Sequence, residues 1–340
     1  MSKKPGVLII RTRMIGDVLL DTPLIRALRR KGFEVHYLTG RAASEILAWN
    51  PHISRLFRRE DYRFVELLKT VRINRYYALF DFMHNLWSMA LTAFSGADIR
   101  AAITEGDAVF PYNFKVKPPY EAKPYTVFHR LEFLRTLGID PEGFSADLEF
   151  PLPDDILKTM EERLREAGWR KGEFLVAVHA DPGSPVRNWP LDRFLSVSER
   201  LVKEFDARVL FIWTPDKKGM LETALAAVKT EKVSLAPPTE TLHHLGALLR
   251  LVDLFFGVDS GPRHIAISQG TPTFAIFTHA SPAGWTPPGD PRHGHVSKGL
   301  PCQPCGKPRC PLGTYECLKT LSVEEVYGSL REFIKRVWER

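Results

Sequence analysis

The sequence contains few features of membrane-bound or secreted proteins. No apolar run in its 340 residues approaches the roughly 18 residues of a membrane-spanning helix. The apolar stretch near the N-terminus is shorter than that of a signal peptide, and no low-complexity tract or short repeat occurs. With 44% apolar and 26% charged residues, the composition is that of a soluble globular protein with sizeable cores. We therefore expect a cytoplasmic protein of two domains.

Two common nucleotide-binding motifs are also absent. A dinucleotide-binding fold normally carries G-x-G-x-x-G after its first strand. The corresponding turn here reads "RTRMIGDV", residues 11–18, and has one glycine. No lysine motif of the P-loop type occurs either. These absences argue against a dehydrogenase and against a P-loop nucleotidase.

Positive charge is concentrated in the first part of the chain. Residues 1–80 hold 16 Lys and Arg against 7 Asp and Glu, whereas the remainder has a small negative excess, giving the overall +7. A basic front part indicates an anionic partner, such as nucleic acid, a phosphorylated lipid surface or an acidic sugar, or else a solvated basic face. Because no aromatic stacking motif is interleaved with these charges, we do not expect nucleic acid as a partner.

Strand and helix patterns alternate along the chain, which predicts the α/β class with parallel sheets. A first series comprises a strand, a helix over 16–32 that Pro23 interrupts, and strands over 33–40 and 76–82. Residues 111–125 are expected to be irregular, and 137–155 to bridge two domains. A second series includes a strand at 173–180, a helix at 191–205 and strands at 207–214 and 254–258. We predict domains at 1–150 and 151–321, and a closing helix, 322–340, that could pack back on the first domain.

Two loops of the second series suit a bound anion. In "DSGPRH", Asp259 ends an apolar strand and Ser260 is a good helix N-cap. Gly261 permits close approach of another backbone, and Pro262 suits the first helical turn. The amides that follow favour phosphate. The loop "HADPGSPVRNWP" offers a cation, Arg187, before another helix. Two such turns predict a diphosphate ligand, and ordinary capped turns are the alternative.

Four segments resemble the lipopolysaccharide heptosyltransferases. "RTRMIGDVLLDTPLIRALR" is similar to their N-terminal signature, and "GVDSGPRHIAISQGTPTFAIF" to their nucleotide-sugar signature. "PGSPVRNWP" resembles a loop that usually reads lysine-arginine-Trp-Pro. "CQPCGKPRCPLGTYECL" is similar to a tail segment of the heptosyltransferase II branch. The resemblance runs in order through both halves, from about residue 7 to 320.

The resemblance implies a GT-B glycosyltransferase with two Rossmann-like domains facing a central crevice. Such enzymes move heptose from ADP-L-glycero-D-manno-heptose to the inner core of lipopolysaccharide, with inversion and without a metal or other cofactor. The donor belongs to the C-terminal domain and the acceptor to the N-terminal one. The acceptor would be an anionic glycolipid, Kdo-lipid A or a heptosylated core, reached by peripheral association with the inner leaflet.

Two other classes of function remain open. A GT-B enzyme of cell-envelope glycan synthesis with another nucleotide-sugar donor would share almost every motif. A non-catalytic protein that binds anions or nucleic acid on the same fold would explain the basic front part but leave Asp17 without a task.

Roles follow for individual residues. Asp17 matches the family's catalytic aspartate and is predicted to be the general base, with helix capping as the alternative; Asp21 is a less favoured base. The residues expected to bind the donor are Arg187, Asp216, Asp259, Ser260, Gly261 and His264. Asp216 is proposed for the ribose hydroxyls, and His264 for a phosphate or for support of its loop. The residues expected at the acceptor are Arg58, Arg59, Arg63 and Asp81.

The only four cysteines lie close together in the chain. Cys302, Cys305, Cys310 and Cys317 have spacings that zinc sites use. The resemblance implies no catalytic metal, and the expectation is that none is bound. Elemental analysis of the purified protein for zinc and iron distinguishes the two interpretations.

Overall fold

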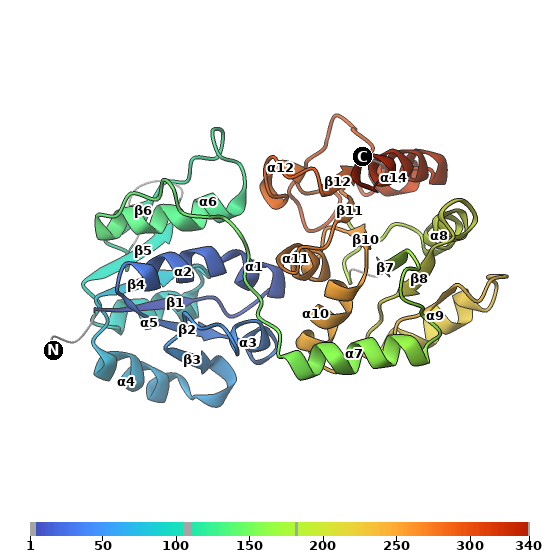
Figure 1. Ribbon diagram of the computed structural model, residues 1–340. Helices are drawn as coiled ribbons and strands as arrows, with labels where there is room; N and C mark the ends of the chain where they lie inside the picture. The colour runs from blue at the N-terminus through green and yellow to red at the C-terminus, as the bar shows by residue number, and fades with distance from the viewer. Residues whose placement is uncertain (1–4, 105–109, 181–182, 339–340) are drawn as a thin grey trace. The chain divides into compact units, whose positions relative to one another are not determined.

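The computed structural model describes residues 5–104, 110–180 and 183–338 (Figure 1). The chain divides into two compact units, Met1–Pro151 and Leu152–Arg340, one residue from the expected boundary. Each unit is built around a six-stranded sheet. Every strand pairing in both sheets is parallel. The α/β class predicted from the alternation of patterns is therefore correct.

The first unit has the strand order β3-β2-β1-β4-β5-β6. Its elements are β1 (Gly6–Ile10), α1 (Ile15–Leu20), α2 (Thr22–Arg30), β2 (Glu34–Thr39), α3 (Arg41–Leu47), β3 (Arg55–Arg58), η1 (Arg59–Asp61), α4 (Phe64–Asn74), β4 (Ala78–Asp81), α5 (Leu86–Phe94), β5 (Ile99–Ile103), β6 (Phe114–Val116), α6 (Thr126–Leu131) and η2 (Glu132–Leu137). The expectation of irregular structure over 111–125 is wrong for β6, which pairs with β5 at the edge of the sheet. Three residues are too few to give a periodic pattern.

The second unit has the strand order β12-β11-β10-β7-β8-β9. Its elements are α7 (Asp154–Glu166), β7 (Leu175–His179), α8 (Leu191–Phe205), β8 (Arg208–Phe211), α9 (Lys218–Leu225), β9 (Val233–Leu235), α10 (Leu242–Leu251), β10 (Leu254–Val258), α11 (Gly261–Ser268), β11 (Thr273–Ile276), α12 (Pro282–Trp285), β12 (His293–Val296), α13 (Glu316–Lys319) and α14 (Val323–Trp338). The helix expected at 191–205 has these bounds in the structure.

Both sheets follow the same topology. Counted along the chain within each unit, the strand order is 3-2-1-4-5-6, the doubly wound order of Rossmann folds. The order reverses between β1 and β4 in the first unit and between β7 and β10 in the second. Ligands of such sheets bind outside the carboxyl ends of the strands at this reversal point. Each unit therefore has one position where a site is expected.

The strands at the two reversal points are strongly apolar, which explains their central position in each sheet. The four residues from Val7 to Ile10 are fully buried, as are Val176 and Phe256, because helices cover both faces of a parallel sheet. Gly257 lies where β10 runs beside β7, and a Cβ atom there would sit 2.7 Å from the carbonyl oxygen of His179. Any larger residue would push apart the two strands that flank the reversal point.

The helix expected over 16–32 is divided at Asp21. Helix α1 ends at Leu20 and α2 begins at Thr22, with Pro23 in its first turn. Proline suits this position because it has no amide hydrogen to leave unpaired. The division places Asp21, which is fully buried, between the two helices.

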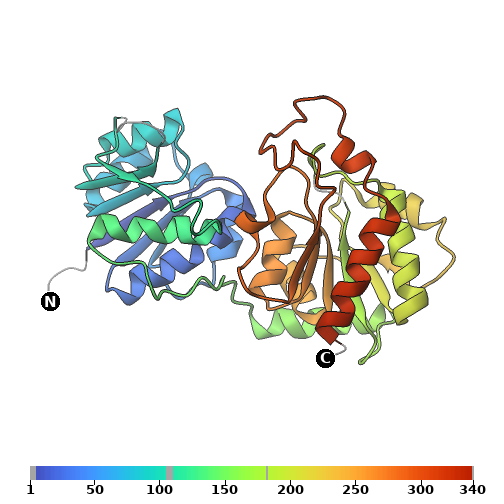
Figure 2. The ribbon, with the colours of Figure 1, turned by 90° about the horizontal axis from the view of Figure 1, so that it is seen from above.

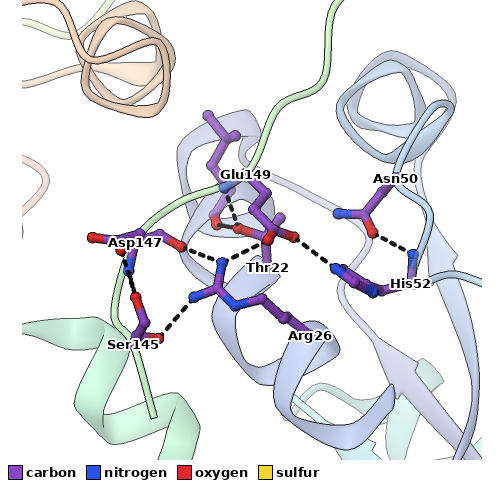
Figure 3. A network of polar contacts seen from close by, with 8 residues as sticks. Thr22, Arg26, Asn50, His52, Ser145, Asp147 and Glu149 are labelled. Atoms are coloured by element: carbon purple, nitrogen blue, oxygen red, sulfur yellow. Dashed lines mark hydrogen bonds and ion pairs between the residues drawn. The ribbon is translucent and has the colours of Figure 1, made fainter. Parts of the chain in front are cut away.

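The segment that bridges the two units is attached to the first of them (Figure 3). The Arg26 guanidinium on α2 donates to the carbonyl oxygens of Ser145 and Asp147 at 2.9 and 3.0 Å, and pairs with Glu149 Oε1 at 2.7 Å. The Glu149 amide donates to Thr22 Oγ1 at 2.9 Å. These contacts fix the bridge to the first unit as far as Glu149.

The closing helix α14 packs within the second unit, beside α8 (Figure 2). Its Tyr327 hydroxyl donates to Glu204 Oε2 on α8 at 2.6 Å, and Leu330 and Phe333 join the core of that unit. The suggestion that this helix packs back on the first domain is therefore corrected. The apolar face of α14 is covered by α8 and by the sheet edge at β12. Among the described residues, no helix is both long and apolar enough to cross a membrane.

Candidate active site

Asp17 lies just beyond the carboxyl end of β1, beside the reversal point of the first sheet. The turn from β1 to α1 passes through Met14, a non-glycine residue with φ of 68°, and brings Asp17 into the first turn of α1. Its side chain is 18% exposed. The Asp17 Oδ1 atom is 3.3 Å from Arg11 Nη1 and 3.2 Å from Arg130 Nη2. A solvent-accessible carboxylate is thus held by two cations at the predicted position.

The same two arginines hold a second carboxylate beneath it. Asp21 Oδ2 is 2.7 Å from Arg11 Nε and accepts from the Tyr37 hydroxyl at 2.6 Å, and Asp21 Oδ1 is 3.1 Å from Arg130 Nε. Burial raises the pKa of Asp21, whereas the two guanidinium groups oppose that shift. Burial and the neighbouring Asp21 raise the pKa of Tyr37, so its hydroxyl remains a donor. Sequence reasoning did not find Arg130, which is 113 residues from Asp17.

Asp81 ends β4, the strand on the other side of the reversal point. It is 1% exposed. Its Oδ1 atom accepts from the amides of Met83 and His84 at 2.8 and 3.1 Å, and Oδ2 accepts from the Tyr112 hydroxyl at 2.7 Å. Oδ1 therefore holds the loop that follows β4, and Oδ2 holds Tyr112, which precedes β6.

The three candidate arginines for the acceptor are all exposed at the end of β3. Arg58 is in register with Thr39 on β2, which places it at the same carboxyl edge as Asp17, two strands away. Its Nε atom donates to Ser44 Oγ at 3.1 Å. The Arg59 guanidinium lies 4.9 Å from the ring centre of Trp87. Arg63 precedes α4.

In the second unit, the loop after β10 differs in one detail from the expectation. Ser260 occupies the N-cap position of α11, but no hydrogen bond from the helix amides to its side chain forms. Its hydroxyl is instead 3.1 Å from His179 Nδ1 at the end of β7. The contact joins the two strands that flank the reversal point. Helix α11 begins at Gly261. Its first turn therefore lies at the reversal point of the second sheet without a side-chain cap.

Asp259, Arg263 and His264 form a buried group beneath this turn. Arg263 is fully buried, and it donates to the Trp285 carbonyl at 3.0 Å and to Thr286 Oγ1 at 2.9 Å. Asp259 Oδ1 is 3.6 Å from Arg263 Nη1 and 3.8 Å from His264 Nε2. Burial, reinforced by Arg263 and Arg187, lowers the pKa of His264 to about 3. His264 is therefore a neutral imidazole at neutral pH.

Arg187 lies near this group, although it comes from the loop between β7 and α8. Its charge contributes to the lowered pKa of both His264 and His279. The loop is fixed on either side of Arg187: the Thr278 hydroxyl donates to the Val186 carbonyl, and the fully buried Trp189 donates from Nε1 to the Leu321 carbonyl at 2.9 Å. Trp189 of the motif thus anchors the end of this loop. The preceding residues Asp181 and Pro182 lie outside the described part of the chain.

Asp216 follows β8, the strand next to β7. It is exposed, and its Oδ1 atom accepts from the Thr214 hydroxyl at 2.7 Å, which lowers the pKa of Asp216. Asp216, His179 and Ser260 lie at the same carboxyl edge of the sheet. Among the described contacts, Asp216 forms no hydrogen bond with the other two. Asp216 therefore lies beyond the carboxyl end of β8, and its role in donor binding stays a prediction.

The four cysteines lie near one another in the structure: burial, reinforced by the neighbouring Cys310, Cys302 and Cys305, raises the pKa of Cys317. Within the described residues, no group of three or more His, Cys, Asp and Glu side chains is placed to hold a metal ion. The amides of Leu312, Gly313, Thr314 and Tyr315 surround the Cys310 sulfur and lower its pKa. The four cysteines are free thiols.

Two Rossmann-like units, each with charged and polar residues at its reversal point, define the GT-B class of glycosyltransferase fold. A family model described as glycosyltransferase family 9 (heptosyltransferase) matches residues 64–316. The chain belongs to this family and is a glycosyltransferase. The recognition made from the sequence motifs is confirmed.

Known relatives agree with this assignment. Lipopolysaccharide heptosyltransferase 3 of Escherichia coli is 26% identical over 296 residues, which cover 81% of this chain and 84% of the relative. A glycosyl transferase family 9 structure from Veillonella parvula has a TM-score of 0.82 at 19% identity, with 99% of each chain covered. The structure of E. coli ADP-heptose lps heptosyltransferase II has a TM-score of 0.75 at 17% identity, covering 97% of this chain and 99% of the other.

The lowered pKa of His264 predicts acid sensitivity of the second unit. Below a pH of about 6.5 the unfolded chain gains a proton at His264 that the folded chain takes up only near pH 3. Stability is therefore lost as the pH falls between these values, by about 2 kcal/mol at pH 5 from this residue. We expect His264→Gln to flatten the fall of Tm between pH 7.5 and 5 in calorimetric scans. An unchanged slope would show that His264 is already charged in the folded state.

Proposed function

We propose that this glycosyltransferase moves heptose, with inversion, from ADP-L-glycero-D-manno-heptose to the inner core of lipopolysaccharide. Membership of family 9 and the names of the relatives support the reaction class and the acceptor. The observation that carries the residue assignment is the position of Asp17. It is a partly accessible carboxylate at the reversal point of a Rossmann-like sheet, where ligands bind.

In the proposed reaction, Asp17 is the general base. An acceptor hydroxyl oxygen attacks the anomeric carbon of the heptose while the bond from that carbon to the β-phosphate oxygen of ADP breaks. The hydroxyl proton passes to Asp17. A positioned base contributes about 10²–10⁴-fold to such a step. Asp17 suits the role because its carboxylate is 18% exposed, whereas Asp21 and Asp81 are buried and bonded within the chain.

The charge that develops on ADP is stabilised by the second unit in this proposal. The Ser260 hydroxyl contacts His179 and does not cap the first turn of α11. Pro262 has no amide hydrogen, and the Arg263 amide donates to the Ser260 carbonyl at 3.1 Å, so the amides that the turn can offer a ligand are those of Ser260 and Gly261. These amides and Arg187 would bind the diphosphate. Neutral His264 and Asp259 support the turn, and Asp216 is proposed to bind ribose hydroxyls. The proposed transfer uses no metal ion.

We expect Asp17→Asn to lower turnover by two or more orders of magnitude, because the amide cannot accept the proton. Affinity for ADP should be nearly unchanged, since the nucleotide is assigned to the other unit. Steady-state rates of heptose transfer and calorimetric titration with ADP measure the two effects. A variant with half of the wild-type activity would show that Asp17 is not the base.

The assignment of Arg187 is tested by comparing ADP with adenosine. Charge-assisted hydrogen bonds to phosphate are worth about 1.5–3 kcal/mol each, so Arg187→Ala should weaken ADP binding roughly ten- to hundredfold and leave adenosine binding nearly unchanged. Arg200→Ala is the control, because Arg200 pairs with Glu324 on the outer helices. Equal losses for ADP and adenosine would mean that Arg187 only holds its loop.

The acceptor is proposed to reach the first unit at the cytoplasmic face of the membrane. Arg58, Arg59 and Arg63 are exposed near the end of β3. Two exposed apolar side chains, Val65 at 60% and Leu86 at 86%, lie in the first turns of α4 and α5, which pack together. Basic and apolar side chains in one region suit an anionic lipid surface. Asp81 would act at the acceptor through the loop that it holds.

We expect binding to vesicles that requires anionic lipid and falls steeply with salt. Each basic residue near such a surface contributes about 1 kcal/mol, and the attraction decays over about 8 Å at physiological ionic strength. Changing both Arg58 and Arg59 to Glu should weaken co-sedimentation with the vesicles but not ADP binding. The control changes Arg165 and Lys171 to Glu and alters the net charge equally in the second unit. Binding that ignores salt, or is equal on neutral vesicles, would contradict electrostatic docking.

A further inference from the structure

Two cations and two carboxylates meet at the end of β1 in a closed arrangement. Each guanidinium bridges both carboxylates: Arg11 through Nε to Asp21 and Nη1 to Asp17, and Arg130 through Nε to Asp21 and Nη2 to Asp17. Both guanidinium groups also lie against the ring of Phe82, at 4.8 and 4.9 Å from its centre. The buried Asp21 and the ring of Phe82 therefore fix the positions of the two guanidinium groups.

The two carboxylates of this arrangement are not equivalent. Asp21 is fully buried, and its distance to Arg11 is 2.7 Å, against 3.3 Å for Asp17. Tyr37 donates a further hydrogen bond to Asp21 at 2.6 Å. Asp21 is thus surrounded by donors and closed to substrate, whereas Asp17 is partly open to solvent.

This asymmetry matters for a base. Without a second carboxylate, the charge of both guanidinium groups would act on Asp17 alone, and an opposite charge at this distance favours the ionised form of a carboxyl by about 1–3 pKa units. A base stabilised in that way takes a proton less readily. We propose that Asp21 is a positioning residue that balances Arg11 and Arg130, so that these arginines orient Asp17 without suppressing its function as a base. The inference rests on the proposed role of Asp17.

Other ionisable side chains lie on the helices that pack against α1. The remaining ionisable side chains on the helices packed against α1 are Arg26, Arg29 and Arg30 on α2, Arg41 and Glu45 on α3, and His129 on α6. Arg26 pairs with Glu149, and Arg41 pairs with Asp61. Burial lowers the pKa of His129, so it is neutral at neutral pH. The charges that act directly on Asp17 are those of Arg11, Arg130 and Asp21.

The test is the pH profile of kcat for Asp21→Asn. We expect kcat to fall roughly tenfold or more and the acidic limb to move to lower pH by about one unit. The KM for the donor should change little. Glu149→Gln is the matched control, because it also converts a carboxylate that pairs with a buried arginine on the neighbouring helix α2. It should leave both kcat and the limb in place.

A double-mutant cycle separates this role from a structural one. If Asp21 acts through Asp17, adding Asp21→Asn to Asp17→Asn should cause no further loss of kcat. Additive losses, or a loss with the acidic limb unmoved, would overturn the inference and leave Asp21 a structural residue. If Asp17→Asn itself is active, the proposed base is wrong instead.

A second variant covers the case in which Asp21→Asn fails to fold. Arg130→Gln removes one of the two cations and leaves Asp21 in place. We expect the acidic limb of its kcat profile to move to higher pH, opposite to the shift for Asp21→Asn. An unmoved limb, or a shift to lower pH, would contradict the proposal.

Discussion

The parallel arrangement of each sheet is the constraint on which the candidate site depends. In a parallel sheet all carboxyl ends lie at one edge, and a reversal of strand order separates the helices that follow two adjacent strands. The close approach of β10 to β7 at Gly257 shows how tightly one reversal point is built. Arg58 and Asp81 end strands of the first sheet, and Asp259 and Ser260 directly follow β10 of the second.

Buried charge is handled differently at the two reversal points. In the first unit, two arginines are balanced by two aspartates, and the surplus of donors is directed at the buried one. In the second unit, Arg263 is matched by one carboxylate and by neutral oxygens, and the nearby His264 is kept uncharged by burial. An anionic ligand beside Arg187 and the α11 turn would balance the charge of Arg187, because Arg263 is already matched by Asp259. At the reversal point of the first unit, the two arginines are already balanced by two aspartates. This arrangement suits a general base rather than the binding of an anion.

Much of this fold could be predicted from the sequence, because strands buried on both faces give continuous apolar runs and turns carry Gly, Pro and Asp at fixed places. Asp17, Ser260 and Arg187 were chosen as candidates from such turns and from the family motifs, and their roles stay predictions. Arg130 and Arg263 were not. The first comes from a helix far along the chain, and the second appears in its motif as an ordinary helical residue whose contacts with Trp285 and Thr286 only the fold creates. The detailed role of Ser260 was also missed, since the partner of its hydroxyl, His179, is 81 residues away.

The central claim is that the second unit binds the ADP part of a heptose donor, and nucleotide selectivity tests it most directly. Calorimetric titration of the intact protein with ADP, UDP and GDP, followed by ADP-heptose, measures that selectivity. The account predicts that ADP binds most tightly of the three diphosphates and that ADP-heptose binds at the same site, in competition with ADP. Preferential binding of UDP or GDP would contradict the heptose assignment, even though the family and the fold would stand.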